Sequence, residues 1–383
     1  MKKVFYFLFM VLGTTILGQI TGKVEFKKVY KIKEYQDAHN IGFGTTQKDS
    51  EDNFYIFDKY SLKIHKYNKH GKYIKSVGRR GRGPKEFLHF SFVYVNQKDQ
   101  IIVIDRYQNK IKTFDSNLNY LTSKTFSYEK FYTTYSAVNV GEYILTGSID
   151  SPTPLRFVES DFSDLVKELN LNITQYYTNN RVDKENIFYG SFTTNLIYFN
   201  NKIIYSPYFY SGKLLAVETK TDWLDEENYQ TEYIKGYQCG NIPYRVYKPN
   251  ERNHIKGFSM TNRGRDEIIV AELNISRGIY NLNNEWILNL IRIKKGDYAV
   301  LGFEVYNKEL KYLGFYEIKR KKLKINNYPH IRGAVHVVFS DNTILWAYRD
   351  ENDDLIYAKS KIKFIDKDGK ERINLYKKQN VKK

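Results

Sequence analysis

The chain has 383 residues, and its 61 Lys and Arg residues exceed its 43 Asp and Glu residues to give a formal net charge of +18. Hydrophobic residues make up 42% of it and charged residues 27%, which are globular proportions that exclude a disordered, collagen-like or polytopic membrane chain. The single cysteine, Cys239, excludes an intrachain disulfide and a cysteine-rich zinc site.

Residues 1–18 have the three-part layout of a secretory signal peptide. Residues 1–3 are positively charged, residues 4–17 are almost wholly apolar, and the small and polar residues around Gly18 provide a cleavage site. The alternative, an uncleaved membrane anchor, is disfavoured because the apolar run is shorter than the roughly twenty residues that span a bilayer. No cysteine follows the run, which excludes a lipid anchor there. We expect a mature chain from Gln19 that is exported to the periplasm or the extracellular space and has no transmembrane anchor.

The basic net charge favours an anionic partner, unless it reflects a biased genome composition that also enriches Asn, Ile and Tyr. Such a charge generally attracts nucleic acid, an anionic membrane or an acidic glycan. Export argues against nucleic acid as the natural partner. The expected partner is therefore a protein or glycan of the cell envelope or the extracellular space.

Short strands dominate the rest of the chain, and one stretch of them is repeated. Apolar and polar residues alternate in short runs bounded by Gly, Asn and Asp, and only residues 160–171 look helical. The sequence DNFYIFDKY at residues 52–60 recurs 47 positions later as DQIIVIDRY at residues 99–107. A repeat of about 40 to 50 residues made of short strands is typical of a β-propeller blade. The expected fold class is all-β, a propeller of four-stranded antiparallel blades.

Six blades are favoured, and seven are the alternative. Weaker repeat starts follow near residues 141, 201, 266, 296 and 341. The long gaps between some of them are interpreted as insertions, and the starts at Asp266 and Gly296 as parts of one blade. The alternating segment 23–32 precedes the first full repeat, so we expect it to pair with the C-terminal strands and close the ring. Because no Pro-, Gly- or Ser-rich linker divides the chain, residues 19–383 are expected to form one domain, as a monomer.

The second repeat resembles a known family. Residues 78–87 contain the pattern Gly-Pro-x-x-Phe, and strands ending in Asp105 and in Phe114-Asp115 follow. This order resembles the NHL-type repeat and, more narrowly, the exported six-bladed β-propeller proteins common in Bacteroidetes. The likeness covers residues 53–121, with Lys85 where those relatives often carry Gly. The resemblance implies the fold and a binding role, and it brings no agreed catalytic residues.

The order of turns in the first repeat predicts one charged face. In an up-and-down sheet, successive turns lie at alternate ends, so the turn after Asp58, the loop after Val77 and the turn after Asp105 share an end. Arg offers a planar charged fork for carboxylate, sulfate or phosphate, and Tyr offers an apolar face with a hydroxyl. The predicted ligand-binding residues at this end are Lys59, Tyr60, Arg79, Arg80, Arg82, Arg106 and Tyr107.

A structural interpretation of the same segments is the alternative. The glycines could serve tight backbone geometry, Glu86 could accept loop amides, Phe87 could pack between blades, and Asp58 and Asp105 could cap turns. In that view the three arginines belong to a solvated basic loop. A second candidate surface, for stacking on sugars, comprises Tyr176, Tyr177, Tyr205, Tyr208 and Tyr210.

No catalytic motif is identifiable in the chain. The pattern His-Glu-x-x-His is absent and the seven histidines lack metal-ligand spacing, so we expect neither a metal nor a cofactor. The expected function is an exported binding module that recognises a protein or an acidic glycan through one loop face. The alternative is a propeller enzyme, a polysaccharide lyase or hydrolase or a lactonase-like protein, whose catalytic residues come from several blades. A cluster of two or more carboxylates, or a His–carboxylate pair, at the channel mouth would favour the enzyme.

Overall fold

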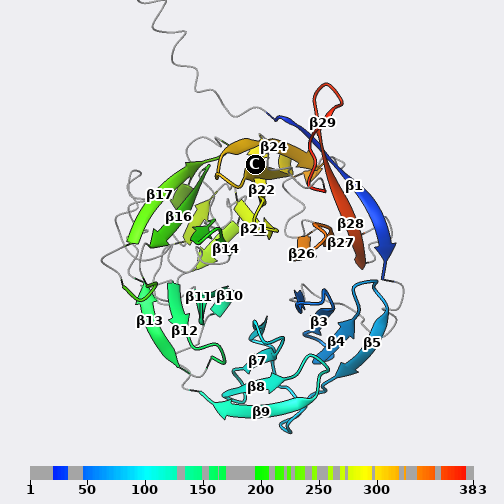
Figure 1. Cartoon of the computed structure of the whole chain (residues 1–383), viewed down its shortest axis with the longest axis vertical. Coiled ribbons are helices and arrows are strands. Elements are labelled where there is room, and N and C mark those ends of the chain that lie inside the picture. The colour runs from blue at the N-terminus through cyan, green and yellow to red at the C-terminus, as the bar shows by residue number, and fades with distance from the viewer. Residues whose placement is uncertain are drawn as a thin grey trace, which may run out of the picture.

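Small antiparallel sheets stand around a central axis in the computed structural model of this protein (Figure 1). All of the described elements are strands, and the helix-like segment within residues 160–171 contains strand β13 instead. Among the described residues, no helix is long and apolar enough to cross a membrane. The predicted signal peptide lies outside the described residues, which are 20–32, 46–126, 134–148, 155–162, 164–169, 195–206, 212–219, 222–225, 229–237, 244–247, 258–261, 268–271, 275–295, 298–318, 323–324, 334–349 and 355–376.

Four blades are separate four-stranded sheets, in which the first strand lies nearest the axis and the fourth is outermost (Figure 1). Blade one contains β2 (Thr46–Lys48), β3 (Phe54–Asp58), β4 (Lys63–Tyr67) and β5 (Tyr73–Val77). Blade two contains β6 (Phe92–Val95), β7 (Ile101–Asp105), β8 (Lys110–Phe114) and β9 (Tyr120–Thr125). Blade three contains β10 (Thr134–Val140), β11 (Tyr143–Ser148), β12 (Leu155–Val158) and β13 (Leu165–Leu169). Blade four contains β14 (Leu196–Phe199), β15 (Lys202–Tyr205), β16 (Lys213–Thr219) and β17 (Tyr229–Lys235).

The last two blades are joined into one ten-stranded sheet. Blade five contains β21 (Ile275–Leu282), β22 (Trp286–Lys295), β23 (Tyr298–Asn307) and β24 (Tyr312–Ile318), with the short β25 (Leu323–Lys324) on β23. Blade six contains β26 (Ala334–Val338), β27 (Ile344–Arg349), β28 (Leu355–Asp366) and β1 (Gly22–Lys31), with β29 (Glu371–Ile373) on β28. The all-β propeller with four-stranded antiparallel blades is thereby confirmed.

The N-terminal strand closes the ring, as the sequence predicts. Strand β1 pairs antiparallel with β28, from Gly22 opposite Asp366 to Lys31 opposite Ala358. Its first residues also pair in parallel with β24, where Gly22 lies opposite Tyr316. Strand β1 therefore completes blade six and joins it to blade five, which removes two sheet edges at once.

One sheet was not predicted, and it changes the assignment of one repeat start. Strands β18 (Tyr244–Tyr247), β19 (Phe258–Thr261) and β20 (Ile268–Ala271) form a three-stranded sheet in the order β18-β20-β19. The repeat start at Asp266 leads into β20, whereas the start at Gly296 leads into β23 of blade five. The prediction that these two starts belong to one blade is therefore wrong. Apolar strands of similar length look alike in a sequence, and only their pairing separates them.

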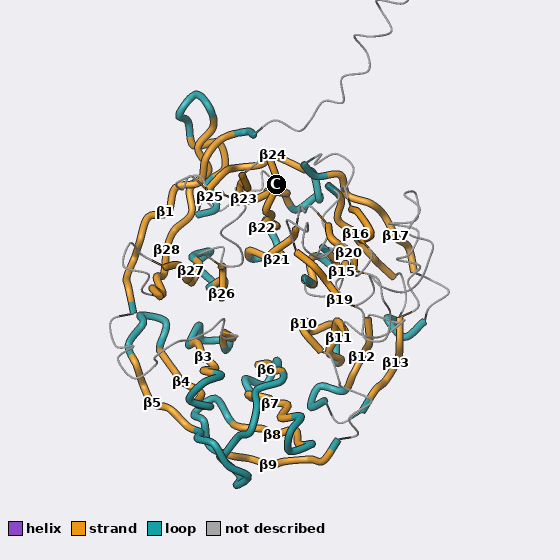
Figure 2. The backbone as a smooth tube through the Cα atoms, turned by 180° about the vertical axis from the view of Figure 1, so that it is seen from behind, coloured by secondary structure: helices purple, strands orange, loops and turns teal. Residues whose placement is uncertain are grey.

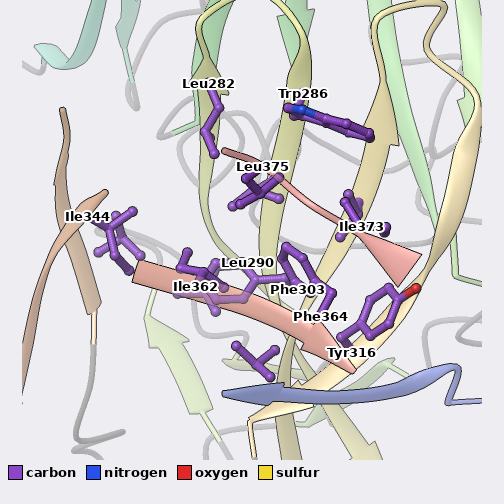
Figure 3. Close-up of a cluster of buried hydrophobic side chains, with 14 of the residues drawn as sticks. Leu282, Trp286, Leu290, Phe303, Tyr316, Ile344, Ile362, Phe364, Ile373 and Leu375 are labelled. Atoms are coloured by element: carbon purple, nitrogen blue, oxygen red, sulfur yellow. The ribbon is translucent and has the colours of Figure 1, made fainter. Parts of the chain in front are cut away.

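Each blade packs both faces against its neighbours, so the cores lie between blades. Strand β3 is buried at every position, which explains why it reads as a continuous apolar run rather than an alternating one. Figure 3 shows the corresponding cluster between blades five and six, in which the Phe303 ring lies 6.3 Å from those of Trp346 and Phe364, measured between centroids. Burying one such side chain contributes about 1.5–3 kcal/mol.

The two ends of the blades carry different turns. We call the end that carries the turns between first and second strands, and between third and fourth strands, the lower face. The end that carries the turns between second and third strands, and the loops between blades, is the upper face. On the lower face, side chains tie each blade to the next: Asp99 accepts hydrogen bonds from Ser50 N (2.8 Å) and Oγ, and Asp52 accepts them from Ser340 N (3.0 Å) and Oγ.

Candidate functional site

The structure brings the predicted ligand-binding residues to the upper face of blades one and two. Gln108, in the turn after β7, donates from Nε2 to the carbonyl oxygens of Gly81 (3.0 Å) and Glu86 (3.2 Å) in the loop after β5. The positive charge of Arg106 is also close enough to Lys59 to affect its pKa. We call the predicted set the basic rim; it comprises Lys59, Tyr60, Arg79, Arg80, Arg82, Arg106 and Tyr107.

The loop of residues 78–87 has a rigid frame of its own. Gly78 has a φ of 111°, and a Cβ built there would lie 2.4 Å from the carbonyl oxygen of Leu62, so only glycine fits. Phe87 is fully buried between the blades, with its ring centroid 4.7 Å from that of Phe90. The buried Lys112 donates from Nζ to the carbonyl oxygens of Gly83 (2.8 Å) and Glu86. The structural interpretation of the glycines and of Phe87 is therefore confirmed.

Glu86 neutralises one of the three arginines. Its Oε2 accepts a hydrogen bond from Gly83 N (2.8 Å), and its Oε1 accepts one from Arg79 Nε (2.7 Å). The Gly83 N–H group and then the Arg79 guanidinium lower the pKa of the Glu86 carboxyl, so it is ionised at neutral pH. Arg80 and Arg82 are exposed, and neither forms an ion pair with a carboxylate in the described part of the chain. Together with the exposed Lys85, Arg80 and Arg82 therefore carry the positive charge of the loop that has no described carboxylate partner.

Two further carboxylates beside the rim, Asp58 and Asp105, accept hydrogen bonds from local backbone and side-chain groups. Asp105 is fully buried and accepts hydrogen bonds from Leu88 N (2.7 Å), Tyr107 N (3.1 Å) and Gln108 Nε2 (2.8 Å). Asp58 is buried in the same way and accepts from Tyr60 N (2.8 Å). Both residues cap their turns, as the structural interpretation predicts. Their negative charges are therefore committed to local hydrogen bonds rather than to the cations beside them.

Two cations of the rim, Lys59 and Arg106, lie close to a histidine that sequence reasoning missed. Burial and the positive charge of Arg106 lower the pKa of Lys59. Burial, Arg106 and Lys59 together lower the pKa of His89, although Asp105 opposes this. His89 Nδ1 lies 3.0 Å from Ser91 Oγ, which also accepts from Arg106 N (3.1 Å). Lys59 and Arg106 therefore bring positive charge to one small region, and the lowered pKa keeps the His89 imidazole beside them neutral at neutral pH.

Two tyrosines of the rim project into solvent, with 63% of Tyr60 and 60% of Tyr107 exposed. The Tyr107 ring is fixed from one side, because its centroid lies 5.0 Å from that of His89 and 5.1 Å from Arg106 Cζ. The other aromatic candidate is weakened, since Tyr205 is buried. The remaining residues of that group, Tyr176, Tyr177, Tyr208 and Tyr210, lie outside the described residues.

The rim region offers little that would indicate metal binding or catalysis. The described residues contain no cluster of three or more His, Cys, Asp or Glu side chains that could hold a metal ion. His89 has Asp105 nearby, but the hydrogen bonds from Leu88, Tyr107 and Gln108 occupy that buried carboxylate. This pair is therefore poorly suited to act as a general acid and base.

Solved structures resemble the chain at the level of the fold. A presumed exported protein of Bacteroides fragilis aligns with a TM-score of 0.53 and 14% identity, over 89% of this chain and 95% of that one. A member of the DUF4221 family from Bacteroides vulgatus aligns with a TM-score of 0.54 and 9% identity, over 90% of this chain and 99% of that one. A search of the curated proteins found no match.

One family model matches most of the chain. The DUF5128 family, described as a 6-bladed beta-propeller, matches residues 34–331. Its blade number agrees with the six four-stranded blades among the described strands. The narrower likeness to the NHL-type repeat stays a resemblance of residues 53–121. The chain therefore belongs to the DUF5128 family of six-bladed β-propellers.

Proposed function

We propose that the protein is an exported binding module whose basic rim recognises an acidic partner, with an acidic glycan favoured over a protein. The observation that carries this proposal is that Lys59 and Arg106 share one rim, where burial and then the positive charge of Arg106 lower the pKa of Lys59. Each cation lies beside the other, and neither forms an ion pair with a carboxylate of the described residues. A carboxylate or sulfate of a ligand placed between them would remove the repulsion and gain two charge-assisted hydrogen bonds.

The exposed tyrosines favour a glycan. A sugar ring presents an apolar face to an aromatic side chain and hydroxyl groups to its surroundings, and Tyr60 and Tyr107 offer both kinds of contact. The Tyr107 ring already packs against Arg106 and His89, so little side-chain entropy is lost when a ligand stacks on it. Arg80 and Arg82, which lie further along the rim, would contact a second acidic group of an extended chain.

Export is part of the same proposal. Its support is the signal-like segment 1–18 and the structural likeness to a presumed exported protein of Bacteroides fragilis. An envelope or extracellular compartment would supply acidic polysaccharides as ligands.

The test compares the two faces of blade one. Binding of polygalacturonate, and of a neutral glucan as the reference, is measured by calorimetry at two salt concentrations. The double variant Lys59→Gln/Arg106→Gln removes two charges from the rim, and Lys69→Gln/Lys72→Gln removes two from exposed positions on the lower face. We expect the rim variant to weaken polygalacturonate binding at least tenfold and the lower-face variant to change it less than twofold.

Each other outcome argues against the proposal. Equal weakening by the two variants would mean that net charge alone attracts the ligand. Binding of the neutral glucan with the same affinity would remove the role of the anionic groups. Unchanged binding in the rim variant would place the ligand elsewhere. In the rim variant, the affinity for polygalacturonate should also depend less on salt concentration, because fewer charge pairs remain to be screened.

A further inference from the structure

Three of the innermost strands are interrupted at the same place. In each, the ladder to the second strand skips one residue near the start of the first strand. The skipped residues are Tyr135 in β10, Arg277 in β21 and His336 in β26. Such β-bulges redirect side chains and are frequent beside functional sites. Side chains are described at two of these positions, Arg277 and His336. A permanent cation and an imidazole are unusual there, because burying such groups in a strand that packs against two neighbours costs free energy.

The interruptions lie at the upper end of the axis. The first strand of every blade follows an upper-face loop, so its beginning is its upper end. Figure 2 shows β10, β21 and β26 around the centre of the ring. Arg277 and His336 therefore lie on the same face as the basic rim, but on blades five and six rather than one and two.

Described contacts bring the two bulged strands together and connect His336 to blade one. His336 Nδ1 lies 3.2 Å from Thr46 Oγ1 on the innermost strand of blade one. Tyr280 donates from its hydroxyl to the carbonyl oxygen of Val335, the residue before His336 (3.3 Å), and the charge of Arg277 acts on that phenol. A Cβ at Gly278 would lie 2.1 Å from the Tyr280 hydroxyl, so glycine is what admits the phenol. Through the Tyr280 hydroxyl, the bulge at Arg277 therefore lies beside the bulge at His336.

We propose that the upper ends of the innermost strands of blades five, six and one form a second site, which binds a small oxyanion through Arg277 and His336. Arg277 supplies a planar fork that matches a carboxylate, sulfate or phosphate. His336 supplies a ring N–H donor, with its orientation set by Thr46. Both side chains are partly exposed, so a ligand can reach them from the upper face. This site is independent of the basic rim.

The test follows histidine side chains by NMR in the full chain labelled at histidine. Inorganic sulfate, inorganic phosphate and acetate are titrated separately, and His336→Gln assigns the His336 signal. We expect the His336 signal to move and to saturate, while the signal of His70, in an exposed turn of the lower face, stays in place. The three anions distinguish a sulfate, a phosphate and a carboxylate ligand.

Matched arginine variants separate this site from the rim. Arg277→Gln should raise the apparent Kd of the preferred anion at least tenfold, and Arg82→Gln should change it less than twofold. The inference is overturned if none of the three anions moves the His336 signal, or if Arg82→Gln costs as much as Arg277→Gln. If Arg277→Gln unfolds the protein, Thr46→Val serves instead. It removes the Thr46 hydroxyl that contacts His336 Nδ1, so it should weaken binding of the anion. An unchanged Kd would contradict the assignment. Movement of the His89 signal alone would assign the anion to the basic rim.

Discussion

The lower and upper faces of blades one and two use their charges in opposite ways. On the lower face, the carboxylates of Asp52 and Asp99 bind the serine of the preceding blade, so the charged groups hold neighbouring blades together. On the upper face, Asp58 caps its own turn and Asp105 accepts from its turn and from Leu88 N of the preceding loop, and the cations Lys59, Arg82 and Arg106 remain without described carboxylate partners. A charge that is satisfied across a blade boundary serves assembly. A charge that is left without such a partner is available to a ligand.

The largest effect on stability is expected for Asp105, an upper-face carboxylate that accepts hydrogen bonds from backbone N–H groups. Asp105→Ala would leave the N–H groups of Leu88 and Tyr107 without their acceptor in a fully buried position, so we expect a loss of about 3 kcal/mol in the free energy of unfolding. The matched control is Asp115→Ala in the lower turn of the same blade. Asp115 accepts from Asn119 N (2.7 Å) near solvent, so about 1 kcal/mol is expected there. Urea denaturation measures both, and equal losses would show that the upper carboxylate has no special structural role.

A smaller effect, dependent on pH, is expected for Asp52→Asn. Burial opposes ionisation of Asp52, but the bonds from Lys48 and Ser340 outweigh it and lower the pKa of the carboxyl. A lowered pKa in the folded state stabilises the protein above the ordinary value of 3.8, and this stabilisation is lost as the pH falls through the folded-state value. We expect a loss of about 2 kcal/mol at pH 7.

The stabilities of the Asp52→Asn variant and the unmodified protein should therefore converge as the pH falls from the ordinary value of 3.8 through the lowered folded-state pKa of Asp52. Glu51→Gln, at an exposed position of the same turn, is the control and should stay within about 0.5 kcal/mol. A difference between the Asp52 variant and the unmodified protein that persists unchanged to low pH would mean that the ionised carboxylate does not tie blade six to blade one.

The smallest effect has the opposite sign. Burial and then the positive charge of Arg106 lower the pKa of Lys59, so Lys59→Gln, which removes the charge, should raise the stability at neutral pH by a few tenths of a kcal/mol. The penalty from protonated Lys59 is present at neutral pH and disappears above the ordinary lysine pKa of 10.5. Thermal unfolding at pH 7 checks this, with Lys69→Gln on the lower face as the control. A loss of stability would show that Lys59 is a structural residue.

The sequence was sufficient for the regular part of the fold. The 47-residue repeat identified blades one and two, because β3 and β7 have the same length and the same terminal aspartate. Turn order alone was enough to place Lys59, Arg79 and Arg106 on one face. The three-stranded sheet could not be predicted, because the sequences of β18 and β20 resemble those of blade strands. Only their pairing shows that they form a separate sheet.

The finer features of the site depend on the folded loop and could not be read from the sequence. The pairing of Arg79 with Glu86 requires the loop to close on itself through the hydrogen bond from Phe87 N to Arg79 O. His89 matters because Lys59 and Arg106, far from it in sequence, come close to it. The bulges at Arg277 and His336 are differences in strand register, which a single strand's sequence does not reveal.

The position of β1 in the ring makes the order of synthesis matter. Residues 22–31 leave the ribosome more than three hundred residues before their antiparallel partner, residues 355–366. Until that partner is made, the nascent protein exposes unpaired strands. Closing so long a loop is still feasible, because its entropic cost in free energy grows by only about 0.6 kcal/mol for each doubling of loop length. A chain cut short before β28 would keep open edges on both β1 and β27. Ring closure thus distinguishes complete chains from incomplete ones, and proteases or chaperones that recognise exposed strands could use that difference.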